Sequence, residues 1–301
     1  MTKLVIWYGE LITRKNLFKR GLFFLVPGML WLLLFLVLPG LILVLVSFAG
    51  RGSYGELAWE FGVENYTRLA GYGIFGWTLD YAIILFRSIW VAFVTICLSV
   101  LLSYPLCFFI ARKPRQTRYL WLTIVIIPFW TNMVIRTYAW FLILAPEMPI
   151  AKLAAFLNIV PDGTPLYPSA FAVYLGMISI FLPFVTLPLF ACVERLDWTL
   201  VEAAQDLYAS SFGTFVHAIL PQTLPGLSVG VTLTLVPAMG MFVVPDLLGG
   251  AKYMLIGNLI QQQFGTSRDY AFGAAISMAL MVLTMLSLYF YKKKNRNINL
   301  L

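Results

Sequence analysis

The segment TLVEAAQDLYASSFGTFVHAILP, residues 199–221, is a polar interruption between two of the most apolar stretches of the chain. Two carboxylates, glutamines and several small residues gather around it, whereas 61% of the 301 residues are hydrophobic and only 11% are charged. So few charged residues cannot cover the surface of a soluble protein of this size. The composition therefore predicts a polytopic membrane protein, with residues 199–221 as a water-exposed connection.

The apolar stretches place the membrane spans, because about 20 helical residues cross the hydrocarbon core. We predict an all-α integral membrane protein with six transmembrane helices, at about 22–48, 81–110, 119–144, 168–193, 225–246 and 271–291. The first stretch exceeds the apolar length of a signal peptide, so we expect a retained span. Together the spans form one domain, 22–291, with a cytoplasmic N-terminal lead, 1–21, and a basic C-terminal tail, 292–301.

The basic residues predict the orientation, since Lys and Arg are held on the cytoplasmic side. They are concentrated in 1–21, 111–118 and 292–301, so we expect both termini and the connection 194–224 in the cytoplasm. This topology accounts for the net charge of +8. The basicity therefore points to the lipid bilayer as a partner and gives no indication of nucleic-acid binding.

Motifs for chemistry within the chain are missing from the sequence. It contains no G-x-x-x-x-G-K-[ST] phosphate-binding loop, and the single histidine, His217, has no neighbouring Cys or His. The three cysteines fall within predicted spans without metal-ligand spacing. We therefore expect no catalytic residues, metal or cofactor in this chain, and any driving energy must come from an ion gradient or a separate subunit.

The interruption itself predicts a short helix. Thr199 and Glu202 have the spacing of a capping box, which places the helix start near Leu200. Ser210 and Ser211 offer a second cap, and a further short helix is expected to end at Pro221. Helical spacing divides the first helix into an apolar face (Leu200, Ala204, Leu207, Tyr208) and a polar face (Glu202, Gln205, Asp206). Anionic headgroups would repel the acidic face, so a protein partner is favoured over a lipid surface.

A family resemblance is carried by these residues and by three further stretches. Glu202-Ala203-Ala204, followed by Ile219-Leu220-Pro221, is similar to the E-A-A loop of ABC-importer permeases, E-A-A-x-x-x-G-x(9)-I-x-L-P. The stretches IPFWTNMVIRTYAW (127–140), LPFVTLPLF (182–190), LDWTLVEAAQDLYAS (196–210) and LVPAMGMFVVPDLLGGAKYMLIGNLI (235–260) resemble the B-type permeases of spermidine/putrescine importers. Permeases for opines, phosphonates and iron are related to these, so such substrates stay as alternatives.

The resemblance implies a type I ABC-importer permease of the bacterial inner membrane that passes polyamines by alternating access. It implies a cytoplasmic ATPase dimer that holds ATP and Mg, a second permease subunit of the C type, and an extracytoplasmic polyamine-binding protein. It also implies that a coupling helix meets the ATPase through Glu202, Ala203, Ala204, Asp206, Leu207 and Tyr208.

Two residues depart from the E-A-A pattern. Ala218 replaces the first isoleucine, and Tyr208 stands at the glycine position. A left-handed turn there would cost tyrosine about 1–2 kcal/mol. Either the helix continues to Ala209 and Ser210, or Tyr208 is itself a contact, or coupling is weakened.

Polar residues within the spans mark the candidate substrate path. Trp130, Asn132 and Tyr138 follow Pro128 in the third span. Asp246 ends the proline-interrupted fifth span, where it is suited to meet a substrate ammonium group, with Trp130 and Tyr138 offering aromatic faces. The alternatives are a capping role for Asp246 and simple packing for the aromatic rings.

Other features of the spans leave alternatives open. Arg136 is expected either to pair with a carboxylate or a helix C-terminus, or to gate the path. Gly226 and Gly230, and the small residues of 273–277, serve packing within the chain or contact with a second permease. The rival class is a stand-alone secondary transporter. Such transporters commonly show an internal inverted repeat, and the sequence shows no convincing one. A stand-alone mechanism would also give the acidic helix no role.

Overall fold

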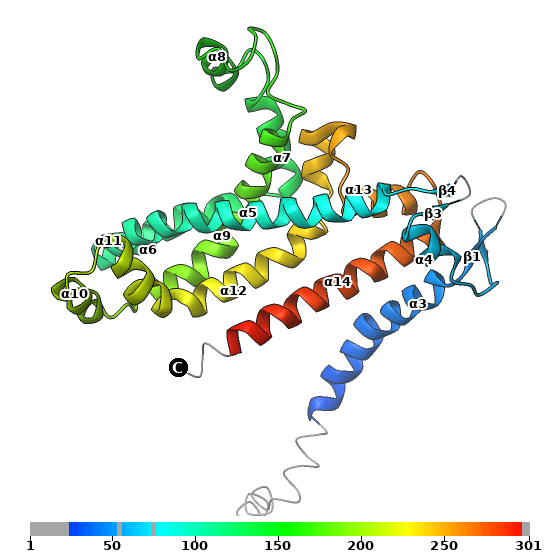
Figure 1. Cartoon of the computed structure of the whole chain (residues 1–301), viewed down its shortest axis with the longest axis horizontal. Coiled ribbons are helices and arrows are strands. Elements are labelled where there is room, and N and C mark those ends of the chain that lie inside the picture. The colour runs from blue at the N-terminus through cyan, green and yellow to red at the C-terminus, as the bar shows by residue number, and fades with distance from the viewer. Residues whose placement is uncertain (1–23, 53–55, 74–75, 297–301) are drawn as a thin grey trace, which may run out of the picture.

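The computed structural model describes residues 24–52, 56–73 and 76–296, and it consists mainly of long helices (Figure 1). Five helices are long and apolar enough to cross a membrane: Phe24–Ser47, α5 (Asp80–Ala111), α9 (Ala170–Val193), Ser211–Met239, and Tyr270–Tyr291 within α14 (Tyr270–Arg296). A bent pair, α6 (Arg115–Trp130) and α7 (Met133–Ile143), supplies a sixth candidate. The described residues thus confirm a mainly helical membrane fold.

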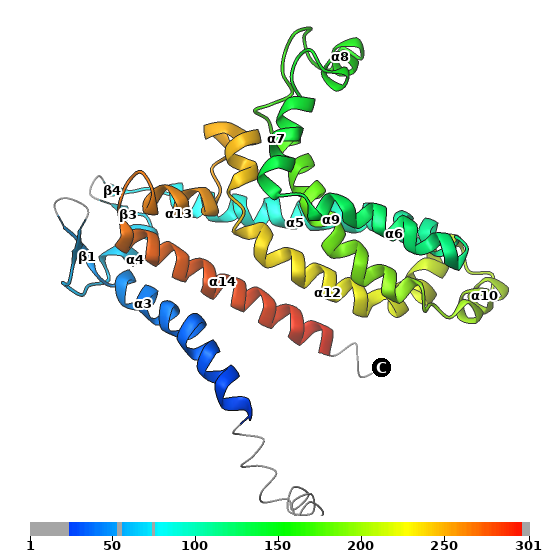
Figure 2. The same cartoon turned by 180° about the vertical axis from the view of Figure 1, so that it is seen from behind.

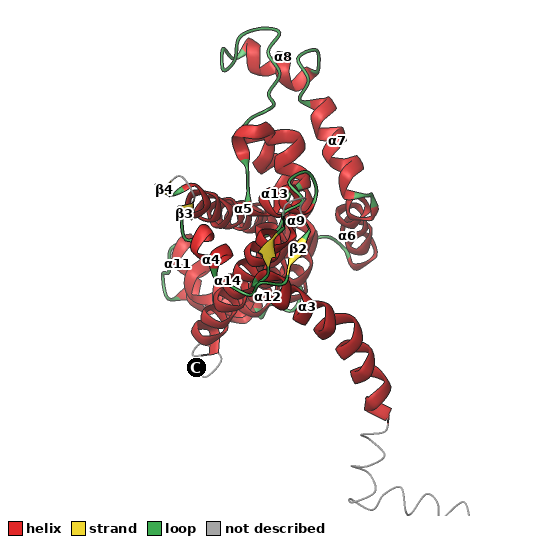
Figure 3. Ribbon diagram, turned by 90° about the vertical axis from the view of Figure 1, so that its right-hand side faces the viewer, coloured by secondary structure: helices red, strands yellow, loops and turns green. Residues whose placement is uncertain are grey.

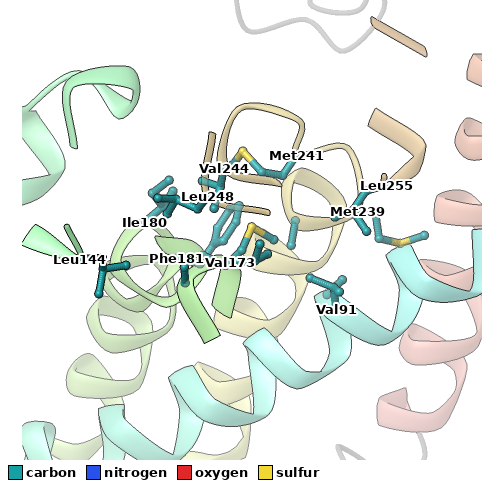
Figure 4. Close-up of a cluster of buried hydrophobic side chains, with 14 residues drawn as sticks. Val91, Leu144, Val173, Ile180, Phe181, Met239, Met241, Val244, Leu248 and Leu255 are labelled. Carbon is teal, nitrogen blue, oxygen red and sulfur yellow. The ribbon is translucent and has the colours of Figure 1, made fainter. Parts of the chain in front are cut away.

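The centre of the bundle is formed by α5, α9 and α12 (Leu220–Met239), which lie side by side in Figures 1 and 2. Buried apolar side chains from these helices meet the segment that follows α12, as Figure 4 shows. The labelled members of this cluster are Val91, Leu144, Val173, Ile180, Phe181, Met239, Met241, Val244, Leu248 and Leu255.

Close approach of α9 and α12 depends on two glycines. A Cβ atom added at Gly226 would lie 2.3 Å from the Pro188 carbonyl oxygen, and one at Gly230 would lie 2.9 Å from Val185 Cα. Small residues allow helices to pack in this way without a bulky side chain between them. Gly226 and Gly230 therefore serve packing within the chain, which decides one of the alternatives that the sequence left open.

The small residues of 273–277 also pack inside the chain. Ala274 and Ala275 are fully buried. A Cβ atom at Gly273 would lie 3.1 Å from Gln263 Cβ on α13 (Ile256–Phe264). The helix α13 was not among the predicted elements, although the spacing of Ile256, Leu259 and Ile260 is that of an amphipathic helix.

The third predicted span, 119–144, is wrong as a single helix. The chain bends by 93° between α6 and α7, because Thr131 and Asn132 adopt extended backbone conformations. The Asn132 side chain then accepts a hydrogen bond from the Val134 N–H (2.8 Å) and begins α7 as its cap. Figure 3 shows α7 and the short α8 (Pro149–Phe156) extending away from the bundle.

The fifth predicted span, 225–246, also needs correction. Residues Ser211–Met239 are continuously helical, through α11 (Ser211–Thr214), the π-helical turn η2 (Phe215–Ile219) and α12. Pro221 does not end this helix; it lies just after the π-helical turn η2, within the continuous helical segment. The chain leaves α12 at Gly240, and Asp246 lies in a separate π-helical turn, η3 (Pro245–Gly249), followed by η4 (Gly250–Tyr253).

The N-terminal span contains η1 (Leu33–Val37) and α3 (Leu38–Ser47). Only 6% of its most apolar 18-residue stretch is buried within the structure. It contacts α14 and diverges from it toward Phe24 (Figures 1 and 2). The predicted lead, 1–21, lies outside the described residues. The sixth span ends at Tyr291, as predicted, and α14 continues as a helix into the predicted tail as far as Arg296.

We call the end that carries α10 (Trp198–Asp206) and α11 the inner end, following the predicted orientation, and the opposite end the outer end. At the outer end, β1 (Gly50–Arg51) pairs antiparallel with β2 (Leu57–Ala58), and β3 (Tyr72–Gly73) pairs with β4 (Gly76–Trp77). The helix α4 (Glu64–Leu69) lies between these pairs and contacts α14. These small elements join the N-terminal span to the rest of the bundle.

Candidate functional site

The helix α10 lies at the inner end and begins at Trp198, earlier than predicted. Its cap is Asp197, whose Oδ1 accepts hydrogen bonds from the Thr199 N–H (3.0 Å) and the Thr199 hydroxyl (2.7 Å). The predicted capping box of Thr199 and Glu202 is therefore wrong. Aspartate caps helices as well as threonine does, so the sequence offered both residues and the structure uses the first.

One face of α10 is anchored to the bundle. Val201 is buried and Ala204 is half-buried, and they pack in a cluster with Leu196, Ala218 and Ile219. Of the predicted apolar face only Ala204 packs against the bundle, because Leu200, Leu207 and Tyr208 are exposed. The tertiary contact selects Val201, which sequence periodicity alone assigned to neither face.

The other face of α10 is open to solvent. It comprises a set of exposed side chains that we call the coupling surface: Leu200, Glu202, Ala203, Asp206, Leu207 and Tyr208. Leu207 is 82% exposed and Tyr208 is 98% exposed. Large apolar side chains presented beside carboxylates at a helix end are typical of a protein-binding surface.

Tyr208 adopts the left-handed conformation, with φ of 59°. Its N–H donates to the Gln205 carbonyl (2.9 Å), and the Ala209 N–H donates to the Ala204 carbonyl (3.1 Å). These two bonds form a Schellman turn that ends α10 at Asp206. The alternative in which the helix continues through Ala209 is therefore wrong. Tyr208 occupies the conformation of the family glycine and points its ring into solvent.

Gln222 on α12 fixes the start of α10 to the neighbouring helix. The Asp197 N–H donates to Gln222 Oε1 on α12 (2.9 Å), and Gln222 Nε2 donates to the Ala218 carbonyl (2.8 Å). The second cap follows the prediction, since the Gly213 N–H donates to Ser210 Oγ (3.2 Å). Sequence reasoning missed Gln222, because nothing in a helical pattern marks a glutamine that reaches back across 25 residues.

An ion pair connects α6 with the end of α9, next to α10 in the chain. Arg118 Nη1 on α6 lies 2.8 Å from Glu194 Oε1 at the end of α9. Arg118 Nη2 donates to the Ala111 carbonyl at the end of α5 (2.8 Å). The inner ends of α5, α6 and α9 are therefore joined, and a displacement of α10 acts on a connected group of helices.

The break between α6 and α7 holds three of the four predicted path residues. Trp130 is the last residue of α6 and is 80% exposed, Asn132 caps α7, and Tyr138 on α7 is 50% exposed. Asp246 is also exposed and lies on η3, a segment that contacts α7. Within the described part of the chain, no hydrogen bond or ion pair joins Asp246 to the other three residues.

Arg136 lies in the first turns of α7 and is half-buried. Its Nη2 donates to the Thr131 carbonyl at the end of α6 (3.0 Å), and its Nη1 donates to the Ser179 carbonyl on α9 (3.3 Å). The structure thus satisfies the guanidinium at a helix C-terminus, one of the expected alternatives. No carboxylate accepts from it among the described residues.

Comparison with known proteins gives a family for this arrangement. Residues 103–298 match the model of the binding-protein-dependent transport system inner membrane component family. The spermidine/putrescine transport system permease protein PotB of Escherichia coli strain K12 is 38% identical over 271 residues, covering 89% of this chain and 95% of that protein. PotB of Haemophilus influenzae is 36% identical over 269 residues, covering 89% and 92%.

Solved structures share the fold at low sequence identity. A chain of a bacterial alginate ABC transporter, crystallised with an alginate-bound periplasmic protein, has a TM-score of 0.71 at 15% identity and covers 95% of this chain. A chain of the MetNI methionine ABC transporter has a TM-score of 0.53 at 15% identity and covers 72%. With the family model matching from within α5 to α14 and relatives matching almost the whole chain, the protein belongs to the inner membrane component family of binding-protein-dependent transport systems.

Proposed function

We propose that the chain is the permease subunit of an ATP-driven importer that passes spermidine or putrescine from an extracytoplasmic binding protein to the cytoplasm. The coupling surface carries this proposal, because it is an exposed apolar and acidic patch on a helix whose other face is fixed to the bundle. The relatives from E. coli and H. influenzae, which are named as spermidine/putrescine permeases, support the substrate class.

The partner at the coupling surface is a cytoplasmic ATPase dimer, which holds the ATP and Mg. This chain supplies no phosphate-binding loop of its own. When the ATPase closes on ATP, it moves α10 through Leu207, Tyr208 and the carboxylates of Glu202 and Asp206. Gln222 then passes the displacement to α12, because it bonds to both the start of α10 and the turn before α12.

The substrate path runs beside the break between α6 and α7. Thr131, Asn132 and Trp130 are exposed there, and Arg136 bonds to Ser179 near the middle of the membrane-spanning helix α9. Irregular backbone and polar side chains at that depth do not face lipid, so they line water or protein. A second permease subunit of the C type completes the path on this side.

Within this path, Asp246 meets a substrate ammonium group, while Trp130 and Tyr138 offer their ring faces to it. Each such cation–π contact contributes about 0.5–2 kcal/mol. The binding protein docks on the outer segments 49–80 and 145–167, which contain the strand pairs, α4 and α8.

The decisive experiment reconstitutes the permease pair in liposomes with and without the ATPase and measures spermidine uptake and ATP hydrolysis. Uptake that requires no ATPase would overturn the importer proposal in favour of a stand-alone transporter. Glu202→Ala should weaken ATPase association without changing membrane insertion. Glu147→Ala is the matched control, because Glu147 is an exposed glutamate paired with Lys152 in the segment after α7. Equal association of both variants would remove Glu202 from the interface.

A second measurement addresses Asp246. Asp246→Asn keeps the size of the side chain and removes its charge, so it should impair uptake while the complex still assembles. Unchanged uptake in Asp246→Asn would return Asp246 to a structural role in η3.

A further inference from the structure

Arg136 holds a set of oxygen atoms that the neighbouring helices leave unused. Besides the carbonyls of Thr131 and Ser179, its Nε donates to Thr131 Oγ1 (3.4 Å). Thr131 follows the last residue of α6, and the final carbonyls of a helix have no partner within it. All three acceptors are neutral, so the guanidinium is not neutralised by a contacting carboxylate within the part of the chain that the structure describes.

The Ser179 carbonyl is free for a different reason. In a regular helix it would accept from the N–H of residue 183, but that residue is Pro183, which has no N–H. Pro183 is buried inside α9. The arginine side chain replaces the missing donor from outside the helix.

Helix-end carbonyls and carbonyls freed by helix interruption bind cations in transporters. The C-terminal end of α6 also carries the negative end of its helix dipole. A primary ammonium group has three N–H donors, which match the three oxygens held by Arg136. The side chain of Asn132 and the ring of Trp130 lie exposed beside them, so a solute in the path can reach this place.

We propose that Thr131 O, Thr131 Oγ1 and Ser179 O form a binding site for an ammonium group. Arg136 donates to these oxygens when the path is empty and releases them when a substrate ammonium group passes. This inference rests on the polyamine function proposed above and adds a specificity-determining residue to its path. The exchange replaces one cation by another, so no carbonyl is left without a donor.

The arrangement also explains why a cationic path contains an arginine. Two like charges cannot occupy the same oxygens, so Arg136 competes with the substrate and keeps its binding weak. Weak binding at several sites allows a solute to leave as well as to enter. The long arginine stem lets the guanidinium swing toward the exposed face of α7 while its Cα stays in place.

The test measures equilibrium retention of radiolabelled spermidine by the complete nucleotide-free importer in nanodiscs, without binding protein. Arg136→Gln removes the competing cation and should tighten retention about tenfold, the equivalent of one charge-assisted hydrogen bond. Millimolar guanidinium chloride, compared with equal NaCl, should displace spermidine from this variant and not from the wild type. Retention that falls or stays unchanged in Arg136→Gln would overturn the proposal.

Proline variants provide a matched pair. Pro183→Ala restores an N–H for the Ser179 carbonyl, so in the Arg136→Gln background it should reverse much of the gain in retention. Pro188→Ala changes the other proline inside α9, whose freed carbonyl Arg136 does not contact, and should leave the gain intact. If the two alanine variants behave alike, the Ser179 carbonyl is not part of a cation site.

Two further readouts separate the possible failures. Arg136→Lys keeps a positive charge, so the complex should still assemble. Its retention of spermidine should lie between those of the wild type and Arg136→Gln. Failure of the wild-type importer to take up any spermidine would contradict the polyamine assignment instead. In that case, a higher unfolding temperature of the Arg136→Gln complex in guanidinium chloride than in NaCl would still show the cation site. Equal unfolding temperatures in the two salts would exclude the site.

Discussion

Tyr208 stands in a backbone conformation that favours glycine, yet its side chain makes no packing contact that would hold it there. Its φ is 59°, and the ring is 98% exposed. A left-handed tyrosine costs about 1–2 kcal/mol relative to its preferred conformation. Because that cost is not offset by burial within this chain, we interpret the exposed ring as part of the surface that meets the ATPase.

Substitution at this residue separates backbone strain from ring contact. Tyr208→Gly should stabilise the Schellman turn by about 1 kcal/mol relative to Tyr208→Ala, because only glycine accepts positive φ without steric cost. Thermal unfolding of the isolated permease measures this difference. Both variants lack the ring, so both should bind the ATPase more weakly than the wild type. Wild-type affinity in both variants would show that Tyr208 is not a contact.

At the scale of helices, the crossing of α9 and α12 is controlled by glycine. Gly226→Ala places a Cβ atom 2.3 Å from the backbone oxygen of Pro188, so the helices must separate. Overpacking of this kind costs about 1–3 kcal/mol. Gly240→Ala is the matched control at the end of the same helix, since no atom lies within 4 Å of its added Cβ.

The prediction is a clear loss of thermal stability for Gly226→Ala and little change for Gly240→Ala, measured on the detergent-solubilised chain. Because α12 connects Gln222 to the outer half of the bundle, Gly226→Ala should also reduce the coupling between ATP hydrolysis and uptake. Equal stability of the two variants would show that α9 and α12 are not in close contact at this crossing.

At the scale of the whole molecule, Asp269 joins the N-terminal part of the chain to α14. Its Oδ2 lies 2.8 Å from Arg68 Nη1 and 3.5 Å from Arg51 Nη1, and its Oδ1 accepts from the Phe272 N–H (3.2 Å). The Arg68 guanidinium also lies 4.0 Å from the centre of the Phe272 ring. Burial lowers the pKa of Arg68, but its contacts, led by the hydrogen bond to Asp269, raise it overall, so this arginine stays charged.

Asp269→Asn should loosen this connection. The asparagine oxygen can still accept from the Phe272 N–H. The change removes the charge and puts an NH2 group, which only donates, where Oδ2 accepted from Arg68 and Arg51. We expect a loss of about 1–3 kcal/mol, less than for a fully buried pair, because the arginine side chains are 39% and 51% exposed. Glu147→Gln, which breaks an exposed pair with Lys152, should have little effect. Thermal unfolding of both variants checks the difference, and equal midpoints would contradict it.

The sequence by itself determined the fold class, because membrane spans follow from the length of apolar stretches and each helix satisfies its own backbone hydrogen bonds. It also located the polar segment at 199–221 and the second cap at Ser210. These features depend on residues close together in the chain.

Tertiary structure alone decided the rest. The choice of Val201 as the buried face and of Gly226 for packing within the chain depends on neighbours distant in sequence. The 93° break after Trp130 and the bonds of Arg136 to the Ser179 carbonyl likewise require α9 beside α7. A local pattern states which groups need a partner, whereas only the packed bundle supplies that partner, and for Arg136 it is a carbonyl that Pro183 leaves free.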